Sequence, residues 1–418
     1  MQTIPNLLQT RPFGADRYCP AVHAARRRRV SLVTLVLVSL AAVLAGALLF
    51  GIARAVAVRY HDDSLWANAV GSLGGTQRPG DFGYVFLPAA NEILGGRSPY
   101  MDPDDFEGPP QAPYAYPPVL ALALVPLTVP PETARGTFVP GVVFVLLLIA
   151  ATVGGLALLD VRDWRCYPVA LLCPFTLEAF EYGAVGPLLF LLIALLWRYR
   201  DRAGAAAAST GVAVVLKLFL WPLLVWLAAT RRLATAGVAA ALAAALALLS
   251  WAVIGFRGIG DYPRLLRKLV DVEAENSYSL FAVLRTLGVP ELLAQGLVIA
   301  AGVLLLVAAW RAAGAPWLGA GERDRRSLTL VLAAALVMTP ILWLHYLVLL
   351  VVPIALARPR LSPLWFVLLV PTVFEALDWY RGWPAGDGEA LASVAVVVAI
   401  VLAGSLRRPG AGRPVPAV

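Results

Sequence analysis

The chain has 418 residues, of which 60% are apolar and only 14% are charged, and its net charge is +8. Soluble domains carry about 25% charged residues, so this composition excludes an ordinary soluble protein and indicates a polytopic membrane protein. The positive charge does not indicate a nucleic-acid partner, because the arginines stand in short polar segments between apolar runs, where they mark topology. The three cysteines form no disulfide or zinc pattern.

The first thirty residues are polar and end in Arg26–Arg29. The apolar run that follows, 31–56, is too long for the hydrophobic part of a signal peptide, so we predict a cytoplasmic segment over 1–30 and an uncleaved first span. Further helix-length apolar runs lie at 117–130, 136–159, 165–180, 184–199, 203–229, 233–256, 289–311, 327–357, 361–378 and 388–406. If 203–229 and 327–357 each break into a hairpin, an integral membrane domain over 31–406 crosses about 12 times. A cytoplasmic tail over 407–418 would follow.

The positions of the arginines predict the orientation of these crossings. With both broken segments as hairpins, the arginine clusters and both termini can share the cytoplasmic side. The opposite side then holds a long first loop, about 59–116, a second loop, about 257–288, and the tips near Glu178, Lys217 and His345. The number of crossings between 117 and 165 agrees with this orientation only if 117–130 is re-entrant or short.

The first outer loop contains the stretch GDFGYVFLPAANEILGGRSPY. We predict that residues 84–94 form an amphipathic helix at the membrane interface, ended by Gly95–Gly96, and that Tyr114 and Tyr116 anchor the return of the chain to the membrane. Asp81 would then lie close to the bilayer surface. The alternative is that Asp81 is a solvated carboxylate like the other aspartates of this loop.

Several motifs follow one another along residues 31–360. DFGY, GGRSPY and YAYPP are followed by EYGAVGPLLFLL, GVAVVLKLFLWPLL, ENSYSLFAVLR and MTPILWLHYLVLLVVP. This order resembles the polyprenol-phosphate-dependent membrane glycosyltransferases of glycosyltransferase family 87, which include actinobacterial mannosyltransferases and arabinofuranosyltransferases of cell-envelope glycolipids. The resemblance implies an all-α GT-C fold in the plasma membrane with an extracytoplasmic active site.

The resemblance also implies a reaction. A mannosyl or arabinofuranosyl residue would pass from a polyprenyl-phosphate sugar donor to a lipid or glycan acceptor of the cell envelope, and no cofactor is expected. GT-C enzymes place a carboxylate of the first outer loop as general base on the acceptor hydroxyl, and Asp81 is the matching residue here. An aspartate is basic enough when proton transfer is late in an oxocarbenium-like displacement.

Lys217 stands alone in a long apolar run, with Pro222 shortly after it. A lysine in hydrocarbon is costly, so it is usually partnered or placed at a helix break. The resemblance implies that Lys217 contacts the donor phosphate, which stays negative as the sugar leaves. The alternatives are snorkelling and a structural ion pair with Glu178 or Glu181.

His345 follows Pro340 and Trp343, which mark a second break. A lone histidine in apolar surroundings is most often a hydrogen-bonded core residue. The resemblance implies instead that His345 donates to the donor phosphate or to sugar hydroxyls. The sequence contains no HEXXH or comparable cluster, so no metal site is expected.

The remaining candidates for binding the donor are Asn276 and Arg285 in the second outer loop, with Tyr84 and Tyr116 in the first. Arginine suits a bidentate phosphate contact. An ordinary interfacial helix, capped near Ser277 or Ser279, explains the second-loop segment equally well.

The stretch EYGAVGP departs from the family, which tends toward a more polar turn at this point. The departure leaves Glu178, Glu181 and Tyr182 as weaker candidates.

Two other classes of protein remain open. A transporter or lipid-linked sugar flippase would carry ionisable residues deep in several spans, along a path through both leaflets. A non-enzymatic scaffold would not need Asp81, Lys217 and His345 near the same face. The expected gathering of these residues at one side favours chemistry over passage.

Overall fold

A computed structural model of the chain describes residues 80–108, 112–128, 138–274, 277–371 and 388–406. This part of the chain is helical and contains no strand. The all-α prediction is therefore confirmed for it. The predicted first span, the basic segment before it, the tail over 407–418 and Asn276 lie outside the described residues.

The helices follow the apolar runs closely, with several breaks. In chain order they are η2 (Asp81–Phe86), α3 (Leu87–Leu94), η3 (Pro103–Asp105), α4 (Val119–Leu124), η4 (Val125–Leu127), α5 (Phe138–Leu158), α6 (Cys166–Leu172), α7 (Pro174–Tyr182), α8 (Gly186–Arg198), α9 (Ala203–Leu216), η5 (Leu218–Leu220), α10 (Pro222–Ala229), α11 (Leu233–Val253), α12 (Tyr262–Glu273), α13 (Leu280–Thr286), α14 (Glu291–Gly314), α15 (Ala320–Met338), η6 (Leu344–Leu350), α16 (Val351–Ala357), α17 (Pro363–Phe366), η7 (Val367–Leu369) and α19 (Gly388–Leu406).

Three of the described helices are long and apolar enough to cross a membrane. They are α5 over Pro140–Leu158, α11 and α14. Helices α7 and α8 pass the same test together but are bent by 119° at the turn between them. The described residues thus hold three or four such spans, and the predicted topology of about 12 crossings is not confirmed, because many of the apolar runs form shorter helices.

The breaks have local causes. Helix α9 ends at Leu216 because Lys217 has extended backbone angles, and Pro222 begins α10. Helix α15 ends at Met338, two residues before Pro340, and the chain turns helical again at Leu344. Both predicted breaks are confirmed.

Two apolar runs form shorter helices than their lengths predict, and one helical segment starts earlier than predicted. The run 165–180 was expected to form one helix, but Cys173 is extended before Pro174 and divides it into α6 and α7. The run 117–130 contains only the short helices α4 and η4, which is the short alternative. In the first outer loop the helical segment begins at Asp81, three residues before the predicted start, and ends at Leu94, before Gly95, as expected.

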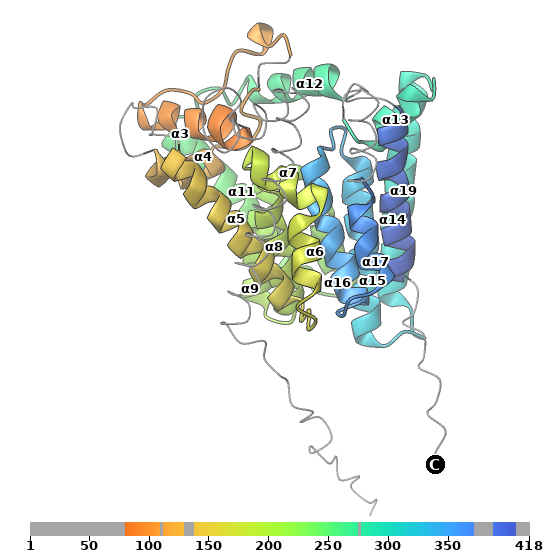
Figure 1. Ribbon diagram of the computed structural model, residues 1–418. Helices are drawn as coiled ribbons and strands as arrows, with labels where there is room; N and C mark the ends of the chain where they lie inside the picture. The colour runs from red at the N-terminus through yellow and green to blue at the C-terminus, as the bar shows by residue number, and fades with distance from the viewer. Residues whose placement is uncertain (1–79, 109–111, 129–137, 275–276, 372–387, 407–418) are drawn as a thin grey trace, which may run out of the picture.

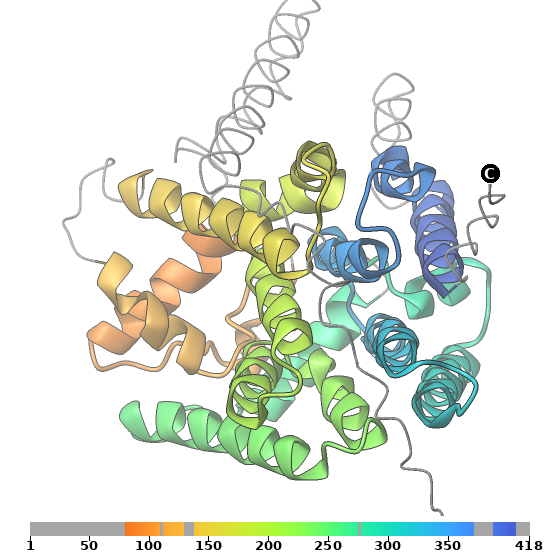
Figure 2. The ribbon, with the colours of Figure 1, turned by 90° about the horizontal axis from the view of Figure 1, so that it is seen from below.

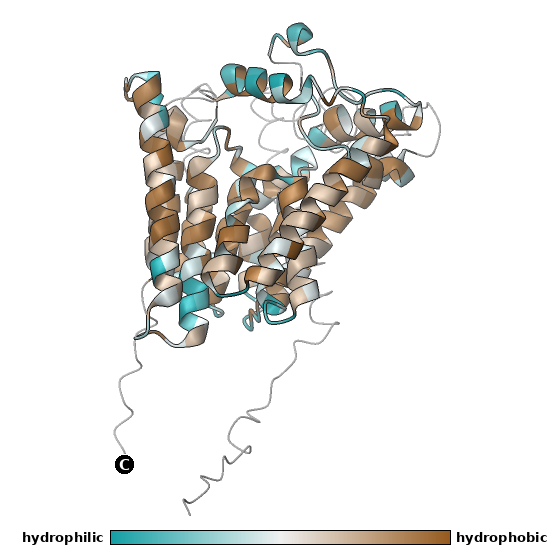
Figure 3. Ribbon diagram, turned by 180° about the vertical axis from the view of Figure 1, so that it is seen from behind, coloured by the Kyte–Doolittle hydropathy of each residue, from teal (hydrophilic) through white to brown (hydrophobic). Residues whose placement is uncertain are grey.

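The long helices form a bundle (Figure 1). Helix α8 packs against α5, α9 and η6, while α14 and α15 lie side by side, as do α9 and α11. Seen along the bundle, α3 and α4 lie at one side and α14, α15 and α19 at the other (Figure 2). Apolar residues dominate the middle of the bundle, and hydrophilic residues gather at its ends (Figure 3).

The interior of the bundle is built around η6 and α16. Every side chain from Leu344 to Ala355 is buried, as a helix that is apolar on all sides should be. This buried segment carries His345 and Tyr346. Helices η2, α3 and α12 lie at the upper end in Figure 1, and the turns between α8 and α9 and between α10 and α11 lie at the lower end.

Candidate active site

Asp81 is the first residue of η2, and close backbone packing fixes its position. A Cβ atom added at Gly80 would lie 2.3 Å from the Cα of Tyr182, so only glycine allows this approach to the end of α7. One residue later, Phe82 is buried and stacks on Phe144 of α5, with 4.6 Å between ring centroids. The segment of the first outer loop around Asp81 is therefore attached to the corner between α7 and α8.

The same corner positions His345. A Cβ atom at Gly186, the first residue of α8, would lie 2.6 Å from the carbonyl oxygen of His345, so α8 and η6 touch backbone to backbone. The imidazole is buried between two carboxylates. Nε2 lies 4.0 Å from Oδ2 of Asp81, and Nδ1 lies 3.8 Å from Oε2 of Glu178.

These two separations are longer than hydrogen bonds, and Nε2 of His345 makes no hydrogen bond to any described residue. A buried polar atom of this kind is unusual in a folded protein, where buried donors and acceptors are nearly all paired. A hydrogen-bonded core histidine, the alternative interpretation, therefore does not account for Nε2. Its free ring nitrogen faces Asp81.

Lys217 reaches the same region from the break between α9 and η5. Its ammonium donates a hydrogen bond to the hydroxyl of Tyr346 and lies 3.9 Å from the centroid of the Tyr116 ring. A cation over an aromatic face is stabilised by the ring quadrupole, and the stabilisation grows where water is excluded. Neither alternative for Lys217, snorkelling or an ion pair with Glu178 or Glu181, describes these contacts.

Tyr116 and Tyr346 bring the end of the outer loop to the buried segment. Both side chains are buried. Tyr116 packs edge to face against Phe86 of η2, and Tyr346 stacks on Phe219, which follows Lys217 by two residues. Sequence reasoning missed Tyr346, although its place next to His345 was a signal. Four separate stretches of chain therefore meet around one point.

The electrostatics of Asp81 reflect this enclosure. Burial disfavours the charged carboxylate and raises the pKa of Asp81 above its ordinary value, while the positive charge of Lys217 acts in the opposite direction. The Asp81 side chain is 29% exposed, so it is less solvated than the exposed Asp102, Asp104 and Asp105 of the same loop. A carboxylate with a raised pKa is a stronger base than an exposed one.

Three predicted residues lie elsewhere or are not described. The side chain of Tyr84 is 53% exposed, so it does not share the burial of Tyr116. Nη1 of Arg285 donates to the carbonyl of Val289, in the turn after α13, and α13 lies on the far side of the bundle from α3 (Figure 1). The ordinary capped helix offered as an alternative is observed, because the Ser279 hydroxyl accepts from the backbone N–H of Ala282. Asn276 is outside the described residues.

The site combines a base, a cation and an imidazole at one end of a membrane bundle. Such a set can take a proton from a hydroxyl and stabilise a neighbouring anion. Within the described ranges, no three His, Cys, Asp or Glu side chains are grouped as metal ligands would be.

Comparison with known proteins adds one finding. The sequence model of glycosyltransferase family 87 matches residues 114–353, more than half of the chain. This range includes Tyr116, Glu178, Lys217 and His345, whereas Asp81 lies before it. No curated protein and no solved structure matches the chain.

Proposed function

The chain belongs to glycosyltransferase family 87 and is a membrane glycosyltransferase, and we propose that it transfers a mannosyl or arabinofuranosyl residue from a polyprenyl-phosphate donor. The acceptor is a hydroxyl of a cell-envelope glycolipid or polysaccharide. The reaction takes place at the end of the bundle that carries η2 and α3, on the extracytoplasmic side of the plasma membrane. Donor and lipid acceptor reach this end sideways through the bilayer.

One observation carries the proposal. His345 lies 4.0 Å from Asp81, on a buried segment whose next residue, Tyr346, accepts a hydrogen bond from Lys217. Partial burial of a base and a cation costs free energy unless they serve a ligand or each other. A glycosyl transfer from a lipid phosphate can use both groups, the base at the acceptor hydroxyl and the cation at the departing phosphate.

The proposed chemistry is a single displacement. Asp81 accepts the proton of the acceptor hydroxyl as the acceptor oxygen bonds to the anomeric carbon of the sugar. The bond between that carbon and the phosphate oxygen breaks, and its electron pair leaves with the polyprenyl phosphate. Lys217 stabilises the departing phosphate, and His345 contacts the phosphate or the sugar hydroxyls. No protein nucleophile is required, so the anomeric configuration inverts.

Transfer of radiolabelled sugar tests the proposal. Membranes containing the protein receive polyprenyl-phosphate mannose or polyprenyl-phosphate arabinose, and the labelled product is counted. We expect Asp81→Asn to lower the rate by about 10²- to 10⁴-fold, as loss of a general base does. Asp105→Asn is the matched control, because Asp105 is an exposed aspartate of the same loop and should leave the rate unchanged.

The outcomes separate the parts of the proposal. Transfer that depends on Asp81 and uses only one donor supports the base and identifies the sugar. Equal transfer by wild type and Asp81→Asn removes Asp81 from the mechanism. An absence of transfer from both donors contradicts the proposed donor class.

A further inference from the structure

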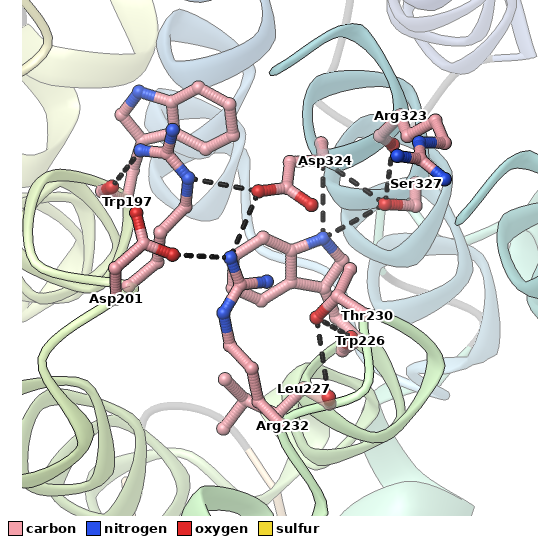
Figure 4. Close-up of polar contacts among 10 residues, drawn as sticks. Trp197, Asp201, Trp226, Leu227, Thr230, Arg232, Arg323, Asp324 and Ser327 are labelled. Atoms are coloured by element: carbon pink, nitrogen blue, oxygen red, sulfur yellow. Dashed lines mark hydrogen bonds and ion pairs between the residues drawn. The ribbon is translucent and has the colours of Figure 1, made fainter. Parts of the chain in front are cut away.

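The end of the bundle opposite Asp81 is rich in arginine, and several of these arginines are paired with carboxylates. Asp324 of α15 accepts from Nε of Arg200 at 2.9 Å and from Nη2 of Arg232 at 3.1 Å (Figure 4). Arg232 also donates to Asp201 at 2.7 Å. This network joins the turn between α8 and α9 and the turn between α10 and α11 to the start of α15. These arginines are structural.

Two arginines beside this network have no such partner. Arg231 and Arg311 make no side-chain hydrogen bond or ion pair with any residue in the described ranges, and both are exposed. They line the same surface hollow of about 360 Å³, together with Trp310 and Trp317. Arg231 also lines an adjoining hollow of about 290 Å³, whose walls include Arg232 and Asp324.

The aromatic and apolar surroundings indicate what kind of anion this hollow suits. The side chains of Trp310 and Trp317 are 54% and 75% exposed. Exposed tryptophans are typical of the boundary between membrane and water. Above them along α14, Leu304 and Val307 are also exposed, which gives an apolar surface leading away from the two guanidinium groups. A free phosphate would use the arginines but not this surface.

Ordinary topology accounts for only part of the arrangement. Arg311 lies in the last turn of α14, where a cation stabilises the helix dipole. Arg231 is different, because its backbone has a φ of +65°. That left-handed conformation follows the end of α10, at a position where glycine is favoured and a side chain costs about 1 kcal/mol. An arginine at this position therefore lowers stability locally. A topological marker would avoid this cost, because a positive charge elsewhere in the loop would serve equally well.

We propose that this hollow binds the headgroup of one anionic phospholipid. Arg231 and Arg311 hold its phosphate, the rings of Trp310 and Trp317 lie at the level of its glycerol, and an acyl chain follows the exposed face of α14. Guanidinium groups suit phosphate oxygens because their donors form a planar fork. The site lies at the end away from Asp81, so it is separate from the proposed chemistry.

Native mass spectrometry of the detergent-purified protein tests the site. The protein is titrated with phosphatidylglycerol, phosphatidylcholine or glycerol 3-phosphate, and bound molecules are counted. We expect phosphatidylglycerol to bind more tightly than the other two. Arg231→Gly and Arg311→Gln should each weaken its binding about fivefold, the ratio that corresponds to about 1 kcal/mol per basic side chain near an anionic lipid. Arg360→Gln is the control, since Arg360 is exposed near the same end but lines neither hollow.

Arg231→Gly also separates binding from folding. Glycine adopts a positive φ without strain, so this variant should be at least as stable as wild type in thermal unfolding while binding the lipid less well. Unchanged phosphatidylglycerol binding in both arginine variants, equal loss in Arg360→Gln, or equal affinity for phosphatidylcholine would overturn the proposal. Binding of glycerol 3-phosphate as tight as that of the lipid would assign the site to a free phosphate instead.

Discussion

His345 and Asp81, which are far apart in the sequence, face each other with 4.0 Å between Nε2 and Oδ2. On its other side the same ring has Nδ1 at 3.8 Å from Glu178. A neutral imidazole carries one proton, so it can donate to only one of these carboxylates at a time. Both separations are longer than hydrogen bonds, so neither carboxylate fixes which ring nitrogen carries the proton.

This relationship predicts the effect of replacing the histidine. His345→Leu should lower the rate of sugar transfer by about 10²-fold, the loss expected when one polar group that serves the transition state is removed. His345→Gln keeps a donor and an acceptor and should retain more activity than the leucine variant. Steady-state rates of the two variants at equal expression check the order. Similar rates for leucine and wild type would restrict His345 to a packing role.

The pH dependence of transfer should reflect the environment of Asp81. A general base acts only as the carboxylate, so the rate falls as pH falls through the pKa of Asp81. Because burial raises that pKa, the loss should begin at a higher pH than an exposed aspartate with a pKa of about 3.9 would give. The profile of kcat/KM against pH measures the position of this acid limb.

Replacing Lys217 tests the direction in which its charge shifts the pKa of Asp81. Its charge favours the carboxylate form of Asp81, so Lys217→Met should move the acid limb to higher pH, in addition to any loss of rate. Lys217→Arg keeps the charge and should leave the limb close to that of wild type. An acid limb at the same pH in Lys217→Met and wild type would mean that Lys217 does not act on Asp81.

Gly186 should be sensitive to a single methyl group. In Gly186→Ala the new Cβ would lie 2.6 Å from the carbonyl oxygen of His345, and the backbones of α8 and η6 would have to separate. We expect a loss of about 1 to 3 kcal/mol in unfolding free energy, together with lower activity. Gly237→Ala is the control in α11. A Cβ there meets nothing within 4 Å, so this variant should be slightly stabilising.

Asp324 should matter more to stability than Asp201, although both accept from Arg232. The Asp324 side chain is 14% exposed and accepts from two arginines, whereas the Asp201 side chain is 75% exposed. Asp324→Asn should cost about 1 to 3 kcal/mol, because it leaves the half-buried Arg200 without a charged partner and leaves Arg232 with only the exposed Asp201. Asp201→Asn should cost less than about 1 kcal/mol. Thermal unfolding in detergent compares them, and equal losses would contradict this difference in burial.

Local chemistry explains the parts of the fold that could be predicted from the sequence. Proline and an isolated lysine mark breaks in any apolar run, so the ends of α9 and α15 could be predicted near Lys217 and Pro340. The division at Cys173 was missed because only the proline after it marks the place. The predicted number of crossings is not confirmed for the described residues, because hydropathy does not distinguish a long span from a short helix buried in the bundle.

Composition and the order of motifs determined, from the sequence alone, that this is a helical membrane protein of a glycosyltransferase family, and they singled out Asp81, Lys217 and His345. Tertiary structure decided which candidates meet. It brought Tyr346 and Glu178 to the site and gave Arg285 a bond to Val289. Hydropathy and charge act along the chain and can be read locally, whereas contact between distant segments depends on how whole helices pack.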